Sequence, residues 1–273
     1  MSRLFIFGLG YAASAIADAA GGPVLATTRD GRGGTIRFDD SDAVRAGLAA
    51  ATHVLSSVPP DDADDPVLAR YGSLLDGKWL GYLSSTGVYG DAGGAWVDES
   101  APIAGRRAAR NTADAAWLAL GARVFRLPGI YGPGRSALDR VAAGKAHRTA
   151  IPGQVFSRVH VDDIALGVVA AFTAPAGAYN LADDYPSSQD AVIDYAAALL
   201  GLPPPPIVPL DSLSPMARAF YAENRRVANG KAKRVLGWHP LYPDYRLGLR
   251  AVSAMTRPKA ANAAPEAANV DQR

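Results

Sequence analysis

The sequence predicts an α/β protein with a doubly wound parallel sheet and a smaller C-terminal domain. Short apolar runs alternate with helical segments from residue 3 to about residue 130, which is typical of stacked β-α-β units. The first apolar run ends in a glycine-containing loop, and the alternation loosens beyond residue 130. A length of 273 residues with 49% hydrophobic residues suits one large domain with a smaller appendage and a sizeable core.

The first half of the chain supplies the expected sheet. Buried parallel strands have continuous apolar runs, and the alanine-rich segment that follows the first run has high helix propensity and ends at two glycines. Strands are expected at residues 3–10, 23–29, 35–38, 52–58, 79–85 and 123–132, with helices at 11–20, 42–50, 65–75 and 110–122. Right-handed crossovers would place these helices on both faces of the sheet.

The second half has a less regular pattern. Helices are expected at 134–146, 188–201, 216–227 and 230–237, a strand turning into a helix at 157–174, a late strand at 178–183 and a proline-rich spacer at 202–210. We therefore expect an α/β domain over 1–170 and a smaller domain mainly over 171–255, to which some loops of residues 130–160 contribute. Residues 256–273 lack a core pattern and are expected to be a disordered tail.

Composition narrows the classes of function. The 28 basic and 26 acidic residues give a net charge of +2, which does not favour nucleic acid or an anionic membrane as partner. The chain has no cysteine, and its four histidines lie far apart, so we expect neither a disulfide nor a metal site. No apolar run is long enough to span a bilayer, and the expectation is a soluble, cytoplasmic protein that acts on a small molecule.

The loop after the first strand has the pattern Gly8-x-Gly10-x-x-Ala13. The first glycine permits a tight turn, the second lets the backbone approach a pyrophosphate, and the small third residue lets the helix pack on the strand. The helix that begins at Tyr11 presents free N–H groups and its positive dipole end to the phosphates. This loop predicts a dinucleotide site that includes Gly8, Gly10, Tyr11 and Ala13.

The end of the second strand indicates which dinucleotide binds. NAD enzymes usually carry an acidic residue there, whereas this chain has Thr28 followed by Arg29. A guanidinium binds a 2′-phosphate that a carboxylate would repel, so NADP is predicted in preference to NAD. The alternative is that Arg29 is a surface residue and Asp30 serves as the acid. Asp39 is expected either beside the adenine or as a helix N-cap.

Four further motifs occur in order along the chain: "YLSSTGVYGD" followed by "WVDES", then "RLPGIYGPG", "RVHVDDIA" and "KRVLGWHP". Together with the glycine loop, they resemble the extended short-chain dehydrogenase/reductase family, which contains NAD(P)-dependent epimerases and dehydratases. The resemblance covers residues 3 to about 250. The short first loop and a missing tyrosine resemble the atypical branch of that family. The resemblance implies that residues 1–170 form a dinucleotide-binding Rossmann domain and that residues 171–255 form most of a substrate domain. It also implies an active site between the two domains and allows a homodimer.

In this family a Ser or Thr binds the reacting group, a Tyr transfers the proton, and a Lys four residues later lowers the pKa of that Tyr and holds the nicotinamide ribose. Ser85 matches the first position, but Arg106 and Arg110 stand where the Tyr and Lys are expected. Arg110 keeps a positive charge for the ribose. Arg106 cannot act as a base, because a guanidinium does not deprotonate in proteins. Because residues four positions apart lie on the same face of a helix, we expect both arginines to point into the interdomain cleft.

Three interpretations remain open. Another group could supply the proton: Tyr89, Tyr131, His160 or a water held by Ser85. Alternatively, the arginines could bind an anionic substrate whose reduction needs no protein base. Finally, the protein could bind NADP(H) without catalysis, as a sensor or regulatory protein.

Each alternative proton donor also has a structural interpretation, because Tyr89 and Tyr131 usually pack within this family and His160 resembles a histidine that shapes the interdomain region. Asp162 and Asp163 are expected to cap the following helix. Arg158 and Arg225 could face substrate anions or solvent.

Overall fold

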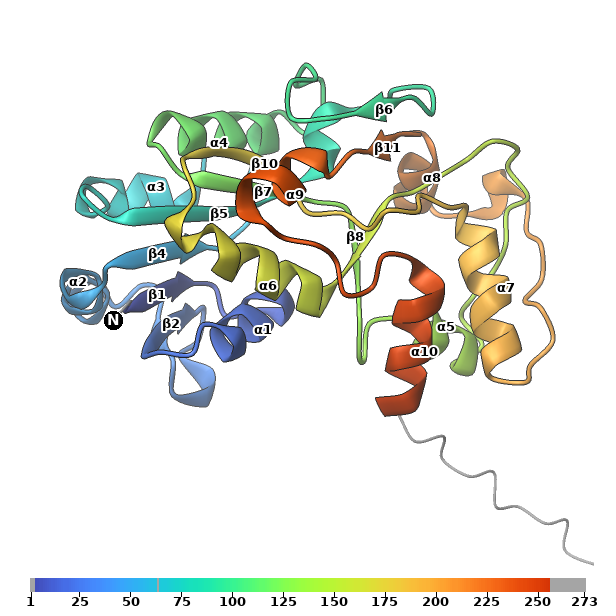
Figure 1. The fold of residues 1–273 in the computed structure, drawn as a ribbon, viewed down its shortest axis with the longest axis horizontal. Coiled ribbons are helices and arrows are strands. Elements are labelled where there is room, and N and C mark those ends of the chain that lie inside the picture. Colours follow the sequence, from blue (N-terminus) through green and yellow to red (C-terminus); the bar gives the residue numbers. More distant parts are fainter. Residues whose placement is uncertain (1–2, 63, 256–273) are drawn as a thin grey trace, which may run out of the picture.

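The computed structural model describes residues 3–62 and 64–255, and its centre is a parallel sheet of seven strands in the order β10-β7-β5-β4-β1-β2-β3 (Figure 1). The strands are β1 (Leu4–Phe7), β2 (Val24–Thr28), β3 (Ile36–Arg37), β4 (His53–Ser56), β5 (Trp79–Ser85), β7 (Arg123–Leu127) and β10 (Gly177–Asn180). The order reverses between β1 and β4, so the sheet is doubly wound, as predicted. The predicted fold class is confirmed.

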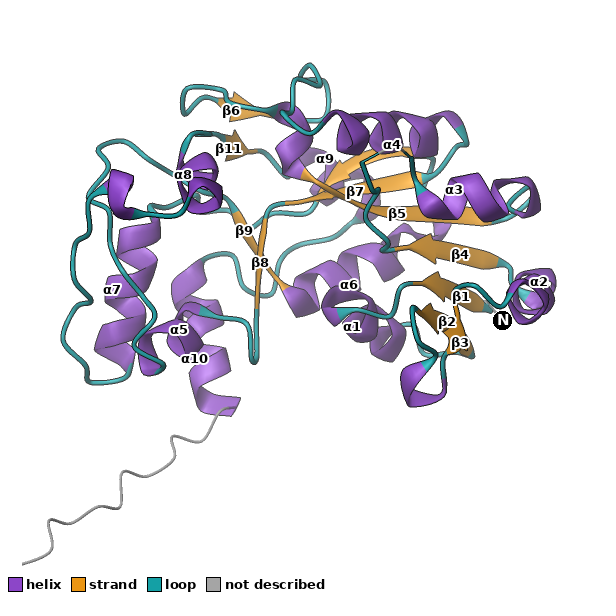
Figure 2. Cartoon of the chain, turned by 180° about the vertical axis from the view of Figure 1, so that it is seen from behind, coloured by secondary structure: helices purple, strands orange, loops and turns teal. Residues whose placement is uncertain are grey.

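Helices cover both faces of this sheet (Figures 1 and 2). One face packs against α1 (Tyr11–Ala19) and α6 (Val161–Ala170), and the other against α2 (Ser41–Ala50), α3 (Pro66–Tyr71) and α4 (Ala108–Ala119). In β1, Leu4 and Ile6 face the first layer while Phe5 and Phe7 face the second. A strand with both faces buried needs an apolar residue at every position, which explains the continuous apolar run.

A third hydrophobic cluster lies beyond the sheet. It is formed by α5 (Ala137–Ala142), α7 (Gln189–Leu199) and α10 (Tyr245–Met255), which lie together on the right of Figure 1. The remaining elements are β6 (Trp96–Val97), β8 (Gly129–Tyr131), β9 (Arg158–His160), α8 (Pro215–Tyr221), β11 (Arg226–Val227) and α9 (Gly230–Leu236). The predicted division at residue 170 stays a prediction, and the sheet strand β10 lies beyond that position.

Several predicted elements differ in detail. The strand expected at 123–132 is divided at Pro128 into β7 and β8, and the helix expected at 216–227 ends at Tyr221. Helix α10 was not predicted, although Tyr245, Leu249 and Val252 bury one helical face. The predicted tail, 256–273, lies outside the described residues.

The expected caps of α6 are wrong. His160 is the N-cap residue, and its Nδ1 accepts a hydrogen bond from the backbone N–H of Asp162 at 3.2 Å. The Asp163 carboxylate instead accepts from the backbone N–H groups of Leu241 and Tyr242, at 2.6 and 3.2 Å. Asp163 therefore anchors the segment that leads into α10.

Among the residues that the structure describes, no helix has the length and apolar character needed to cross a bilayer. Within the same part of the chain, no group of three or more His, Asp or Glu side chains is placed to hold a metal ion.

Candidate active site

The glycine loop has the geometry of a pyrophosphate cradle. Gly8 has φ +82°, a left-handed conformation that favours glycine, and the Ser57 hydroxyl donates to its carbonyl at 2.5 Å. Gly10 is the N-cap of α1, no side chain caps the helix, and a Cβ at Gly10 would meet no atom within 4 Å. Ala13 is buried against the sheet, as the pattern requires. The open space beside Gly10 and the uncapped helix amides fit a dinucleotide phosphate.

A cavity of about 550 Å³ adjoins this loop at the carboxyl ends of β1, β2 and β4. It lies at the point where the strand order reverses, which is where open α/β sheets bind ligands. Gly8, Gly10, Thr28 and Arg29 are among its lining residues. Arg32, which the sequence analysis did not single out, also lines it.

Two predicted cofactor residues lie elsewhere. Asp39 is absent from the lining of this cavity and is paired with Arg37 at 3.0 Å, while the neighbouring Phe38 lines the cavity. The helix N-cap role considered for Asp39 belongs to Asp40, which accepts from the backbone N–H of Ala43. Tyr11 also lies outside the lining, and its hydroxyl donates to the Pro133 carbonyl at 3.0 Å.

A second cavity, of about 450 Å³, lies at the carboxyl ends of β5 and β7. We call it the arginine cavity, because five of its lining residues are arginines and one is a carboxylate. The charged lining residues are Arg106, Arg107, Arg110, Arg158, Arg225 and Glu223. Ser85 lines it from the end of β5, and its hydroxyl accepts from the Gly87 N–H at 3.1 Å. The structure thus brings Ser85, Arg106 and Arg110 together around one cavity.

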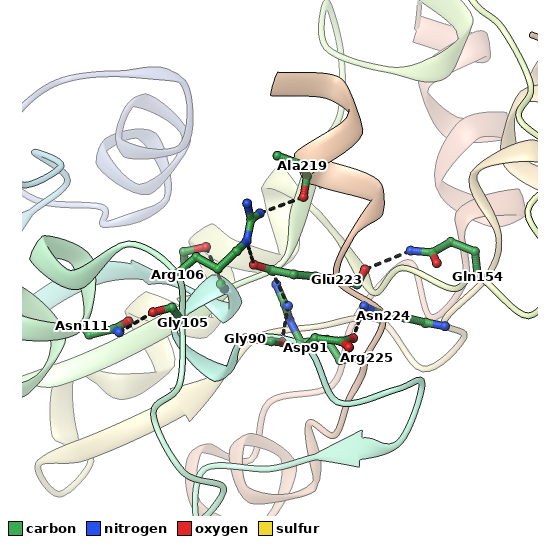
Figure 3. Close-up of polar contacts among 12 residues, drawn as sticks. Gly90, Asp91, Gly105, Arg106, Asn111, Gln154, Ala219, Glu223, Asn224 and Arg225 are labelled. Carbon is green, nitrogen blue, oxygen red and sulfur yellow. Dashed lines mark hydrogen bonds and ion pairs between the residues drawn. The ribbon is translucent and has the colours of Figure 1, made fainter. Parts of the chain in front are cut away.

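The predicted placement of both arginines on one helix face is wrong. Helix α4 begins at Ala108 with Arg107 as its N-cap, so Arg106 lies in the preceding loop and only Arg110 is helical. Arg106 extends towards α8, where its Nη2 donates to the Ala219 carbonyl at 2.8 Å and its Nε to Glu223 at 2.5 Å (Figure 3).

Glu223 is shared between two guanidiniums. Its second oxygen accepts from Arg225 at 2.6 Å, and Arg225 also donates to the Gly90 carbonyl (Figure 3). Burial alone would raise the pKa of Glu223, but the hydrogen bonds from Arg106 and Arg225 outweigh it and lower the pKa, so the carboxylate stays ionised at neutral pH. Glu223 therefore balances part of the positive charge of the arginine cavity.

Arg158 forms part of the cavity wall from a buried position. Its guanidinium donates to Ser187 and to the Gln189 amide oxygen, at 2.8 and 3.1 Å. Burial lowers the pKa of Arg158 to about 10, and the nearby Asp183 opposes this shift. Arg158 and Arg225 thus both face the cavity rather than bulk solvent.

None of the three side chains considered as alternative proton donors lines the arginine cavity. The Tyr89 hydroxyl is buried between Asn180, to which it donates at 2.7 Å, and Arg126. Tyr131 and His160 pack edge-to-face with ring centroids 5.2 Å apart. Burial raises the pKa of both tyrosines and lowers that of His160, which opposes ionisation of all three.

A buried network fixes the wall from which Ser85 projects. Asp114 of α4 accepts from the Ser84 hydroxyl at 2.6 Å and from the Arg126 guanidinium at 2.7 Å, and Arg126 also donates to Tyr89. These bonds tie α4 to β5 and β7, and they set the positions of both Ser85 and Arg110.

Sequence reasoning missed Arg107, Glu223 and the cavity-lining aromatic residues Phe156 and Phe220. Arg107 stands beside Arg106 in "AGRRAAR", so its position was a usable signal. Nothing in the sequence pairs Glu223 with residues near position 106.

Comparison with known proteins agrees with this geometry. The chain has the fold of a solved protein of Silicibacter pomeroyi described as functionally unknown and conserved, with a TM-score of 0.82, 41% identity, and coverage of 93% of this chain and 99% of that one. It also has the fold of the dTDP-glucose 4,6-dehydratase of Bacillus anthracis in complex with NAD (TM-score 0.74, 15% identity, 93% and 96% covered). A human epimerase family protein with NADPH gives a TM-score of 0.71 at 18% identity, with 92% and 99% covered.

Among curated proteins, a 3-diazoavenalumate denitrifying reductase of a Streptomyces species is 35% identical over 138 residues. This match spans 46% of the chain and 45% of the length of that relative. No protein-family model matches the chain.

The fold and the site agree with the resemblance to the extended short-chain dehydrogenase/reductase class that the sequence motifs indicated. The chain belongs to one family with the Silicibacter pomeroyi protein. Of these proteins, the dehydratase is in complex with NAD, the human epimerase family protein is with NADPH, and the curated relative is named a reductase.

Proposed function

We propose that this protein is an NADP(H)-dependent oxidoreductase that acts on a small anionic substrate without the usual Tyr-x-x-x-Lys pair. The observation that carries the proposal is the arginine cavity, where five arginines face one carboxylate beside the Ser85 position. Guanidiniums bind carboxylates and phosphates through charge-assisted hydrogen bonds. The curated relative is named a reductase, which favours hydride transfer over epimerisation.

The residues of the glycine loop would hold the cofactor. Gly8, Gly10 and the N-terminus of α1 are suited to the pyrophosphate, and Ala13 keeps α1 close to the sheet. Arg29 lines the adjoining cavity, whereas Asp30 is absent from the lining and is held by Thr28 and Arg32. This arrangement favours NADP over NAD, because the side chain that reaches the cavity is cationic. When bound, NADPH supplies a hydride.

The side chains of the arginine cavity would orient the substrate and balance charge. The Ser85 hydroxyl accepts from Gly87, which leaves its own proton free to donate to the reacting group. Arg110, which lines the cavity from the first turn of α4, would serve the nicotinamide ribose. The guanidiniums stabilise negative charge but do not exchange protons at neutral pH, so the proton would come from water held by Ser85.

Turnover tests this proposal directly. We expect NADPH consumption, measured as loss of nicotinamide absorbance, with carboxylic acids that carry a carbonyl or another reducible group. We expect no consumption with the corresponding neutral amides. Ser85→Ala and Arg110→Ala should each lower turnover, whereas the exposed Arg45→Ala on α2 should not. Equal rates with acids and amides would contradict the proposal.

The second candidate is a dinucleotide-binding sensor or regulatory protein without catalysis. It is favoured by one observation: within the described residues, the lining of the arginine cavity contains no tyrosine, histidine or lysine. Tight NADPH binding with no oxidation across acids, sugar nucleotides and simple carbonyls would support this candidate and exclude the first.

A further inference from the structure

We infer that the substrate of the arginine cavity is a carboxylic acid with a flat apolar body, and not a sugar nucleotide. The inference rests on the proposed function and adds the chemical class of the substrate. The free hydrogen-bond acceptors, the free donors and the apolar surface of the cavity wall each indicate which chemical groups a substrate can carry.

Most side-chain acceptors of the wall already accept at least one hydrogen bond. Both Glu223 oxygens accept from arginines, and the Gln189 amide oxygen accepts from Arg158. The Ser157 hydroxyl accepts from the Val227 N–H at 2.9 Å, and the Ser85 hydroxyl accepts from Gly87. A sugar brings many hydroxyl donors, and a buried donor without an acceptor is costly. The wall is therefore poorly suited to a polyhydroxy ligand.

The guanidinium of Arg107, in contrast, has no hydrogen-bond or ion-pair partner among the described residues. Arg107 and Arg110 line the cavity, and in the described part of the chain neither forms an ion pair. Arg107 is exposed at the N-cap of α4, beside the pair formed by Arg106 and Glu223. A carboxylate is an acceptor-only group that a guanidinium binds with two parallel bonds. Arg107 is thus the residue we assign to the substrate carboxylate.

The rest of the wall is apolar and partly aromatic. Phe156 and Phe220 stack with ring centroids 4.5 Å apart and an interplanar angle of 11°. Phe220 is 53% exposed although it lines the cavity, so part of its surface remains uncovered. Aromatic rings prefer offset-stacked or edge-to-face partners, so a planar apolar ligand suits this wall better than a sugar. The cavity of about 450 Å³ falls within the range of small-molecule sites.

Calorimetric titration of the NADPH-loaded protein tests the inference without requiring turnover. The probes are 2-naphthoate, its neutral amide 2-naphthamide, the non-planar cyclohexanecarboxylate, and UDP-glucose. We expect 2-naphthoate to bind at least about tenfold more tightly than the amide and UDP-glucose, which corresponds to about 1.4 kcal/mol.

Two variants and one control locate the contacts. Arg107→Gln should weaken 2-naphthoate about tenfold and leave the amide unchanged. Phe220→Leu should reduce the preference for 2-naphthoate over cyclohexanecarboxylate. Arg250→Gln, an exposed arginine of α10 outside the cavity lining, should change neither.

The outcomes distinguish a failure of this substrate assignment from a failure of the proposed function. Tighter binding of UDP-glucose than of 2-naphthoate would overturn the inference and leave an anionic substrate standing. An unchanged planar preference in Phe220→Leu would likewise overturn it. If NADPH binds but no anion binds, the proposed function itself fails.

Discussion

Arg106 donates from Nε to the Glu223 carboxylate at 2.5 Å, although 117 positions separate the two residues in the chain. The family resemblance places a proton-transferring tyrosine at position 106. Here the side chain instead connects the loop before α4 to the segment after α8 (Figure 3). Two further bonds hold that segment: the Gln154 side chain donates to the Glu223 carbonyl, and the Asn224 N–H donates to the Asp91 carboxylate. The arginine at this position has a positioning role that a phenol could not fill with the same bonds.

Restoring the family pair should therefore harm ligand binding. The double variant Arg106→Tyr, Arg110→Lys loses both guanidiniums and, with that of Arg106, the bond to Glu223. We expect about tenfold weaker binding of an anionic ligand, because charge-assisted hydrogen bonds contribute roughly 1.5–3 kcal/mol. Titration of the double variant beside Arg106→Ala and Arg110→Ala measures this. Parent-like affinity in all three would show that the arginines have no part in binding.

Gly10→Val should abolish dinucleotide binding and leave the fold intact. A Cβ at Gly10 meets no protein atom within 4 Å, so the valine side chain would occupy only the space suited to the pyrophosphate. Fluorescence titration with NADPH measures the affinity, and circular dichroism checks the fold. A well-folded variant with unchanged affinity would place the phosphate site elsewhere.

Arg29→Asp should move cofactor preference from NADP towards NAD. One charge-assisted contact to a 2′-phosphate contributes roughly 1.5–3 kcal/mol, so the ratio of the two dissociation constants should change at least about tenfold. The matched control is Arg45→Asp, an exposed arginine on α2 that lies outside the lining of this cavity. A ratio that stays constant in Arg29→Asp would contradict the assignment of Arg29.

Arg126→Met should destabilise the protein strongly. It leaves the Asp114 carboxylate buried without its guanidinium partner, and breaking a buried ion pair costs about 3–5 kcal/mol. The free energy of unfolding in urea measures the loss. Arg37→Met, which breaks the exposed pair with Asp39, should cost much less, because solvent screens that pair. Similar losses in both variants would argue against the buried network.

Asp163 should give the stability a measurable pH dependence. Burial raises the pKa of Asp163 to about 6 in the folded protein, whereas an unfolded aspartate titrates near about 4. The native state then binds more protons than the unfolded state between these values, so the free energy of unfolding falls as pH rises from about 4 to about 6. The change from this one group is on the order of 2–3 kcal/mol.

The variant Asp163→Asn should flatten that part of the pH profile, measured by urea unfolding at several pH values. Asp162→Asn, at the neighbouring and more exposed carboxyl, is the control and should keep the parent slope. An unchanged slope in Asp163→Asn would contradict the raised pKa.

The sequence by itself determined the sheet and the cofactor loop. Continuous apolar runs such as Leu4–Phe7 occur where both faces of a strand are buried, and Gly8 and Gly10 satisfy local backbone demands at one turn. Both signals depend on a few consecutive residues, so they are visible without the fold. The position of Ser85 at the end of a strand, beside Arg110 on the following helix, could be predicted for the same reason.

Only the tertiary structure decided what surrounds those residues. The partner of Arg106 lies 117 positions away, and the aromatic wall joins Phe156 to Phe220 across another long separation. Such contacts depend on how α8 and the segment before β9 come together in the fold, which no local pattern encodes. The start of α4 after Arg106 also follows from this arrangement, because the bonds to Ala219 and Glu223 hold Arg106 in the preceding loop.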